Sequence, residues 1–284
     1  MDNFSKAVQQ IIAQALREDL GRGDITSQAV IPEDARFQGV MRAHQELVVA
    51  GLPMALEVFS TLAPQTYVQA LAAEGQLVAS GTELARIAGP ARALLSAERT
   101  ALNLLQHLSG IATLTRVYVQ RLEGTKAALL DTRKTIPGLR VLAKYATRMG
   151  GAQNHRQRLD DGVLIKDNHI AVCGSLGEAV RRARIAGVSP IEAECDTLKQ
   201  VNEALSSGVE RILLDNMDLP ALRRAVELVA GRAQTEASGG VTLDTIAAIA
   251  HSGVDFISVG RITQSAPAVD IGLDWSRPIR SLSK

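Results

Sequence analysis

The stretch Arg211-Ile-Leu-Leu-Asp-Asn216 is a short apolar run that ends in two polar residues. Five runs of the same character lie beyond residue 125, separated by stretches of helical character: Ala127–Asp131, Val163–Asp167, Ile191–Cys195, Thr235–Gly240 and Phe256–Gly260. Successive runs begin about 20 to 36 residues apart, a spacing that suits strand–helix repeats. The pattern therefore predicts a parallel sheet.

The number of runs separates the possible parallel folds. Six strands in about 140 residues fall short of the roughly 250 residues of a complete eight-stranded barrel. The regular repeat favours a smaller or open α/β barrel, and a doubly wound sheet is the competing interpretation.

The segment before the repeats has a different pattern of apolar residues and glycines. An apolar stripe at helical spacing predicts an amphipathic helix that ends by Gly21; its residues are Val8, Ile11, Ile12, Ala15 and Leu16. Residues 37–89 hold short apolar runs broken by glycines, which predicts strands and turns. Apolar residues crowd most of the circumference between Ala93 and Val119, so we expect helices that are buried on several faces.

Composition excludes several classes of protein. The 284 residues are 46% apolar and 21% charged with a net charge of +1, and no run approaches the length of a membrane span. A disordered chain, a membrane protein and a nucleic-acid coat are therefore excluded. Two cysteines, Cys173 and Cys195, are too few for a disulfide framework, and the start lacks the features of a signal peptide. We expect a soluble cytoplasmic protein with neither nucleic-acid nor membrane partners.

Charged residues, hydroxyls and glycines gather where the predicted strands end. The positions are Asp131-Thr-Arg-Lys134, Lys166-Asp-Asn-His169, Glu194, Asp215-Asn216, Ser238-Gly-Gly240 and Gly260. Active sites of α/β barrels are built at the carboxyl ends of the strands. A solvated loop explains any one of these positions, but their joint occurrence predicts an active-site rim.

The rim is cationic. Between Arg133 and Lys166 there are eight Lys and Arg against two acids, a net charge of +6 in a chain of net charge +1. This concentration predicts a small polyanionic ligand. Within the segment, Arg140, Lys144 and Arg148 repeat at helical spacing, and we interpret them as a solvated stripe.

Further rim residues suggest roles of their own. Ser238–Gly240 and Gly260 predict a phosphate site built from backbone N–H groups. Glu194 and Asp215 suit hydroxyls or a divalent metal such as Mg²⁺, although ion pairs with neighbouring cations would also explain them. His155, between Asn154 and Arg156 on a loop entered through glycines, is placed to bind an anion.

These segments resemble the quinolinate phosphoribosyltransferase family over nearly the whole chain. The resembling stretches are Glu18-Asp-Leu-Gly-Arg-Gly-Asp-Ile-Thr26, Glu98-Arg-Thr-Ala-Leu-Asn103, Ser109-Gly-Ile-Ala-Thr113, Asp131-Thr-Arg-Lys-Thr-Ile-Pro-Gly-Leu-Arg140, Gly150-Gly-Ala-Gln-Asn-His-Arg156, Leu164-Ile-Lys-Asp-Asn-His-Ile170, Leu214-Asp-Asn216, Glu236-Ala-Ser-Gly-Gly240 and Gly253-Val-Asp-Phe-Ile-Ser-Val-Gly260. The Asp-Thr-Arg-Lys-Thr and Asn-His-Arg motifs are far more specific than any glycine pattern.

The resemblance implies a role for each site residue. The two carboxylates of quinolinate would be held by Arg133, His155, Arg156 and Lys166. Lys134 would face the pyrophosphate of phosphoribosyl pyrophosphate, and the adjacent Thr132 would also bind substrate. Glu194 and Asp215 would bind the ribose hydroxyls and Mg²⁺. The residues that would bind the 5-phosphate are Ser238, Gly239, Gly240, Val259, Gly260 and Arg261. Lys134, Glu194 and Asp215 would carry the catalysis, and the last two would be the metal ligands.

The resemblance also implies an architecture and an assembly. Residues 1–116, joined by the returning residues 268–284, would form an N-terminal α/β sandwich domain. Residues 117–267 would form an open barrel of six or seven strands, of which six are visible in the sequence. Arg99 would enter the partner subunit's site, so the active unit would be at least a homodimer.

Three other functions fit part of the pattern. A related phosphoribosyltransferase acting on another pyridine or anionic base would share the phosphate loop, but it would need fewer cations than Arg133, His155, Arg156 and Lys166 supply. A barrel aldolase would use Lys166 as a Schiff-base lysine, which a cation-rich surrounding disfavours. A nucleotide sensor would bind the same ligands without turnover.

Overall fold

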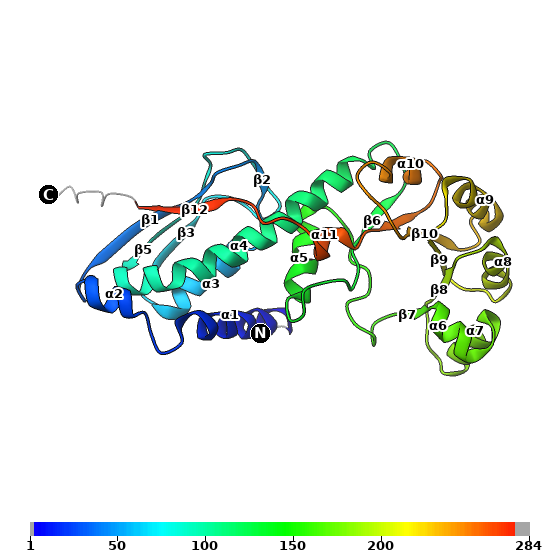
Figure 1. Cartoon of the computed structure of the whole chain (residues 1–284), viewed down its shortest axis with the longest axis horizontal. Helices are drawn as coiled ribbons and strands as arrows, with labels where there is room; N and C mark the ends of the chain where they lie inside the picture. Colours follow the sequence, from blue (N-terminus) through cyan, green and yellow to red (C-terminus); the bar gives the residue numbers. More distant parts are fainter. Residues whose placement is uncertain (1–2, 276–284) are drawn as a thin grey trace. The chain divides into compact units, whose positions relative to one another are not determined.

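The computed structural model describes residues 3–275, and the chain divides into two compact units. Within these residues, unit 1 comprises 3–114, 136–150 and 265–275, and unit 2 comprises 115–135 and 151–264. Figure 1 shows the elements of both. Each unit has its own sheet, the first antiparallel and the second parallel, which confirms the predicted fold class.

Unit 1 is a four-stranded antiparallel sheet with helices on one side (Figure 1). Its strands lie in the order β12 (Ile271–Trp275), β1 (Arg36–Ala43), β5 (Glu83–Pro90) and β3 (Tyr67–Ala70), and a small ribbon joins β2 (Leu47–Val48) to β4 (Leu77–Val78). Its helices are α1 (Asn3–Leu20), α2 (Ile25–Val30), α3 (Leu52–Leu62), α5 (Arg140–Gly150) and most of α4 (Ala91–Gln120). The predicted amphipathic helix is confirmed as α1, whose Val8, Ile12 and Leu16 enter the core.

Helix α5 belongs to unit 1, although the sequence interpretation placed residues 136–150 inside the barrel domain. Leu142, Ala143 and Ala146 join the core that α1, α3 and α4 also build. The interpretation of a solvated stripe is wrong for Lys144, which is fully buried. On the same helix Arg148 is exposed and Arg140 is half-buried, so the three cations do not share one solvated face.

Unit 2 is a six-stranded parallel sheet. Its strands are β6 (Ala128–Leu130), β7 (Val163–Ile165), β8 (Ile191–Cys195), β9 (Arg211–Asp215), β10 (Gln234–Ser238) and β11 (Phe256–Ser258). Between them run α6 (Asp167–Cys173), α7 (Leu176–Ile185), α8 (Leu198–Ser206), α9 (Leu219–Val229) and α10 (Ile246–Ala250), and α11 (Arg261–Gln264) follows β11. All six strands predicted from the sequence are present.

The strand order distinguishes the barrel from the doubly wound sheet. The order is β6-β11-β10-β9-β8-β7, so strands β7 to β11 lie side by side in their chain order, and the first strand, β6, pairs with the last, β11. The sheet is thereby closed apart from a seam between β6 and β7. A doubly wound sheet reverses direction at its centre. At the seam, Gln153 forms a single parallel bridge with Leu130, which fills the position of a seventh strand beside β6. The open barrel is therefore the correct interpretation.

Side chains on the two faces of this sheet differ in character. The register pairs Glu194 with Leu213 and Ser238 with Asp215, so these residues share one face. Arg211 and Glu236, two residues earlier on β9 and β10, lie on the same face because side chains alternate along a strand. The opposite face is apolar and buried, with Ala193, Ile212, Leu214, Ala237 and Ile257. The inner face of the barrel is thus polar near its carboxyl rim.

No helix in the described part of the chain is both long and apolar enough to cross a membrane.

Candidate active site

A buried carboxylate fixes the loop that follows α5. Asp131, directly after β6, is fully buried. Its Oδ2 accepts a hydrogen bond from Asn154 Nδ2 at 2.6 Å, and its Oδ1 accepts one from the backbone N–H of His155 at 2.9 Å. Asp131 therefore holds the Asn-His-Arg motif against the end of the first barrel strand.

His155 points into a cluster of buried acids on the inner face. Its Nε2 lies 2.9 Å from Glu192 Oε2 and 3.6 Å from Glu236 Oε2, and its Nδ1 accepts the backbone N–H of Arg156 at 2.8 Å. Arg211 Nη1 lies 3.4 Å from Glu236 Oε2. Among the described residues, His155, Glu192 and Glu236 form the one group of three possible metal ligands whose atoms lie close together.

The two acids of this cluster titrate differently. Burial, with the nearby charge of Glu192, raises the pKa of Glu236 to about 7. Burial acts on Glu192 too, but the hydrogen bond and charge of His155 outweigh it and lower the Glu192 pKa. Two negative charges on these neighbouring buried carboxyl groups would repel each other, so one group keeps its proton. We assign that proton to Glu236.

His155 is subject to opposing effects. Burial lowers its pKa, whereas Glu192 and Glu236 raise it, with a net increase. Protonation has one cost besides burial, because only a neutral ring can accept the Arg156 N–H at Nδ1. The hydrogen bond at Nδ1 thus opposes the effect of the two acids, and it is made only by a neutral ring with its proton on Nε2.

The proton on Glu236 predicts a dependence of stability on pH. The folded-state pKa near 7 lies above the ordinary value of 4.5, so between these values the folded chain binds a proton that the unfolded chain has released. The free energy of unfolding contributed by this group is present below pH 4.5 and is lost as the pH rises through 7. We expect Glu236→Gln to be more stable relative to the parent at pH 8 than at pH 5, measured as urea midpoints. An equal difference at both pH values would contradict the assignment.

Two arginines of the rim lie within reach of each other's charge. Burial and the charge of Arg133 both lower the pKa of Arg156. Arg156 Nη1 donates to the carbonyl of Gly162 at 2.9 Å, which anchors one end of its guanidinium. Placing two like charges together is unfavourable in a protein alone and becomes favourable when an anion lies between them.

Lys166 follows β7 and reaches across to β8. Its Nζ lies 2.8 Å from Glu194 Oε2, and its backbone N–H donates to His169 Nδ1 at 2.9 Å at the start of α6. A lysine that is bound to a carboxylate lacks the apolar surroundings of a Schiff-base lysine. The pair joins two predicted site residues from neighbouring strand ends.

Lys134 lies beside the loop after β11. Its backbone N–H donates to Thr132 Oγ1 at 3.0 Å, and its carbonyl accepts from Thr263 Oγ1 at 2.7 Å. A Cβ at Gly260 would come within 2.9 Å of the Lys134 side chain. The structure thus brings Lys134 and Thr132 together with the Val259–Arg261 segment, whose glycine leaves room for the lysine.

The ends of β9 and β10 also meet. The backbone N–H of Asn216 donates to the carbonyl of Ser238 at 2.9 Å, and Asn216 Nδ2 donates to Asp215 Oδ2 at 2.6 Å. Gly239 has φ of +89°, and a Cβ there would overlap the Asn216 side chain. Gly240 also has positive φ, with open space around it. Only glycine fits at position 239, so the Ser-Gly-Gly turn is required by this packing.

Arg99 stands apart from the other predicted residues. It is exposed on α4 in unit 1, whereas every other predicted site residue belongs to unit 2. Glu194 and Asp215 share a face of neighbouring strands, but no third side-chain ligand joins them in the described part of the chain.

The sequence analysis missed Glu192, Arg211 and Glu236 as members of the site. A signal was available, because Glu192 lies two residues before Glu194 and Glu236 two residues before Ser238. Alternation along a strand places such pairs on one face. The sequence analysis considered only residues at the strand ends as candidates and gave no role to these acids inside the runs.

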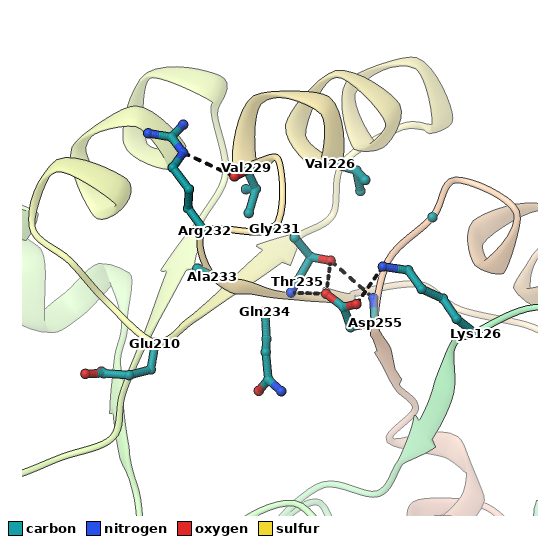
Figure 2. Close-up of a pocket in the computed structure, with 11 residues that line it drawn as sticks. Lys126, Glu210, Val226, Val229, Gly231, Arg232, Ala233, Gln234, Thr235 and Asp255 are labelled. Carbon is teal, nitrogen blue, oxygen red and sulfur yellow. Dashed lines mark hydrogen bonds and ion pairs between the residues drawn. The ribbon is translucent and has the colours of Figure 1, made fainter.

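A hollow of about 410 Å³ opens at the amino-terminal ends of the unit 2 strands, away from the carboxyl rim (Figure 2). Its charged groups already have protein partners: Lys126 Nζ lies 2.6 Å from Asp255 Oδ1, and Asp255 Oδ2 accepts two hydrogen bonds from Thr235. Arg232 donates to carbonyls at the end of α9. This end of a barrel usually serves stability, and these contacts fit that role.

Comparison with known proteins decides the family. A model of the quinolinate phosphoribosyl transferase C-terminal domain matches residues 111–274, and a model of the N-terminal domain matches residues 24–109. The chain belongs to the quinolinate phosphoribosyltransferase family. It is 46% identical over 94% of its length to a probable nicotinate-nucleotide pyrophosphorylase (carboxylating) of Synechocystis, of which the match covers 92%. It is 44% identical over 94% of its length to the Mycobacterium leprae enzyme of that name, of which the match covers 97%.

Solved structures of this family have the same fold. The nicotinate-nucleotide pyrophosphorylase of Ehrlichia chaffeensis superposes with a TM-score of 0.91 at 41% identity, covering 94% of this chain and 98% of that one. The enzyme from Francisella tularensis gives a TM-score of 0.89 at 36% identity, covering 95% and 96%. The family predicted from the sequence is confirmed, and the aldolase interpretation of Lys166 loses its support.

Proposed function

We propose that the chain transfers the phosphoribosyl group of phosphoribosyl pyrophosphate to quinolinate with loss of CO₂, giving nicotinate mononucleotide and pyrophosphate, a step of de novo NAD biosynthesis. The observation that carries the proposal is the match to this family over both domains, and the site supports it because the charge of Arg133 is near enough to lower the pKa of Arg156. Such a pair suits a ligand with more than one carboxylate.

The cationic side of the rim binds quinolinate. Arg133, Arg156 and Lys166 hold its two carboxylates, and His155 belongs to the same group. Lys166 Nζ lies 2.8 Å from Glu194 Oε2, so binding a carboxylate requires that the lysine shares its charge between two anions or exchanges partners. Fixed guanidinium forks orient the pyridine ring and screen the repulsion between two anionic substrates.

The other side of the rim binds phosphoribosyl pyrophosphate. Lys134 and Thr132 face the pyrophosphate. The 5-phosphate lies on Ser238, Gly239 and Gly240 together with Val259, Gly260 and Arg261, where the glycines let backbone N–H groups approach. Glu194 and Asp215 accept hydrogen bonds from the ribose hydroxyls.

Mg²⁺ suits the same two acids. Glu194 and Asp215 offer hard carboxylate oxygens on one face of adjacent strands, and a Mg²⁺ ion usually takes one or two protein carboxylates with the rest of its ligands from substrate and water. When bound, it would neutralise charge on the pyrophosphate.

The chemistry then follows from what the residues hold. Lys134 stabilises the negative charge that develops as pyrophosphate leaves ribose C1. Arg133, Arg156 and Lys166 keep the quinolinate nitrogen aligned with C1 during its attack. The product is a pyridinium, whose positive charge delocalises the carbanion formed when the neighbouring carboxylate departs as CO₂. The ring carbon that lost the carboxylate then takes up a proton.

The direct test supplies quinolinate, phosphoribosyl pyrophosphate and Mg²⁺ and follows CO₂ and pyrophosphate together. We expect the two products in equal amounts. A matched reaction with nicotinate, which has one carboxylate, is expected to be far slower. Equal turnover of nicotinate, or tight binding of both substrates with no turnover, would favour the related transferase or the sensor.

The metal requirement gives a separate prediction. We expect activity to be lost in EDTA and restored by excess Mg²⁺ or Mn²⁺, because Glu194 and Asp215 carry negative charge beside a pyrophosphate. Thermal denaturation in EDTA controls for loss of the fold. Full turnover in EDTA would remove the metal from the proposal.

The proposal extends to assembly and location. A homodimer with Arg99 acting in the partner subunit's site is supported by the exposure of Arg99 on unit 1 and by the family. A cytoplasmic location stays a prediction; the free thiols of Cys173 and Cys195 are consistent with a reducing compartment.

A further inference from the structure

The ring of His155 is held through both of its nitrogens. Nδ1 accepts the backbone N–H of Arg156 at 2.8 Å, so this nitrogen carries no proton. Nε2 then carries the ring proton and donates it to Glu192 Oε2 at 2.9 Å. The hydrogen bonds thus select one neutral tautomer.

The partners of this ring are set into three consecutive strands. Glu192 lies on β8, Arg211 on β9 and Glu236 on β10, and the side chains of the two acids are 9% and 0% exposed. Arg211 also stacks on the Phe256 ring, 4.2 Å from its centroid, which fixes the cation that faces Glu236. The acceptor for His155 is therefore a buried side chain on a strand of the unit 2 sheet.

The ring in turn fixes the residue that follows it. The N–H that Nδ1 accepts is that of Arg156, so the orientation of the imidazole sets the peptide from which the Arg156 side chain leaves. Asp131 holds the preceding peptide through the N–H of His155. The two contacts fix the backbone on both sides of the histidine.

We propose that Glu192 is a positioning residue, which acts through the neutral Nε2–H tautomer of His155 to place Arg156 for substrate binding. This rests on the proposed function, in which Arg156 holds a quinolinate carboxylate. His155 then serves the site through its hydrogen bonds. The rival is an imidazolium that binds quinolinate by its charge, with Glu192 as its counter-ion.

Two substitutions separate these roles. In Glu192→Gln the amide oxygen can still accept the His155 proton, while the negative charge is removed. In Glu192→Leu this acceptor is lost at similar size. Positioning predicts a quinolinate KM within about 3-fold of the parent for Gln and about 10-fold or more higher for Leu, with kcat changed less, since misplacing a binding group can cost up to about 10²-fold. Glu210→Gln, at the opposite end of the strands, is the matched control for a lost carboxylate.

The tautomer is read directly by nitrogen NMR of the protein labelled at its five histidines. His155→Gln assigns the signals, and the spectrum is recorded at pH 7 without substrate. We expect one protonated and one unprotonated ring nitrogen in the parent and in Glu192→Gln, and a tautomer mixture in Glu192→Leu. This measurement stands even if Glu192→Leu does not fold.

Two results would overturn the proposal. One is an imidazolium at His155 in the parent spectrum, and the other is a Glu192→Gln variant that loses quinolinate affinity as strongly as Glu192→Leu. Failure of the proposed function has a different signature, because the parent itself would then bind no quinolinate in calorimetry while the tautomer spectrum remained as expected.

Discussion

Replacing Lys134 by alanine is expected to lower kcat by about 10²-fold or more, the usual scale for removing one preorganised electrostatic stabiliser. Lys134 lies against Gly260 and is held through its backbone by Thr132 and Thr263. In the proposed function its charge faces the pyrophosphate that leaves. Losing a charge that acts mainly in the transition state lowers kcat more than it raises either KM.

Arg133→Ala is expected mainly to raise the KM for quinolinate, whereas Lys134→Ala mainly lowers kcat. Arg133 lies near Arg156, where a carboxylate relieves the repulsion between the two cations. Steady-state kinetics with each substrate varied in turn distinguishes the two variants. Lys126→Ala, which removes a lysine paired with Asp255, controls for general loss of charge. If both rim variants changed only the KM for phosphoribosyl pyrophosphate, the assignment of roles would be wrong.

The barrel could be predicted because its strands carry a local signal. Each run such as Ile191–Cys195 or Arg211–Asp215 is apolar on the face that packs outward and ends in polar residues at the rim. The seventh position could not be predicted, because it is a single bridge at Gln153 in a polar segment and has no apolar run. The choice between an open barrel and a doubly wound sheet also depends on strand order, which no local pattern records.

The polar residues show a similar division. Lys134, Lys166 and Glu194 follow or end apolar runs and are visible as charges at strand ends. The face on which Glu192 and Glu236 lie follows from alternation along each strand, but their contacts depend on the pairing of β8, β9 and β10, since their partners come from other segments. The burial of Lys144 is likewise not recorded in the spacing of the three cations along the helix.

The largest expected effect concerns two variants that are inactive alone. Arg99→Ala and Lys166→Ala should each reduce activity to near background, because removing one partner of a desolvated ionic contact costs about 2–5 kcal/mol. Arg99 is exposed on α4 in unit 1, while Lys166 follows β7 in unit 2. If the site takes its arginine from the partner subunit, the two defects lie in different chains of any one site.

Mixing the two variants under conditions of subunit exchange tests this arrangement. In a heterodimer, the barrel with intact Lys166 meets the intact Arg99 of the other chain, and the second site carries both defects. A random mixture pairs half its chains as heterodimers, each with one intact site, so we expect up to about a quarter of the parent activity.

A control and a contrary outcome complete the experiment. Arg156→Ala mixed with Lys166→Ala should recover nothing, because both residues belong to unit 2 and every pairing leaves each barrel with a defect. If a verified heterodimer of the Arg99 and Lys166 variants stayed at background, or if dilute monomer kept full activity, Arg99 would act within its own chain or not at all. Recovery in the first mixture and none in the second requires a site that draws its arginine from the partner chain.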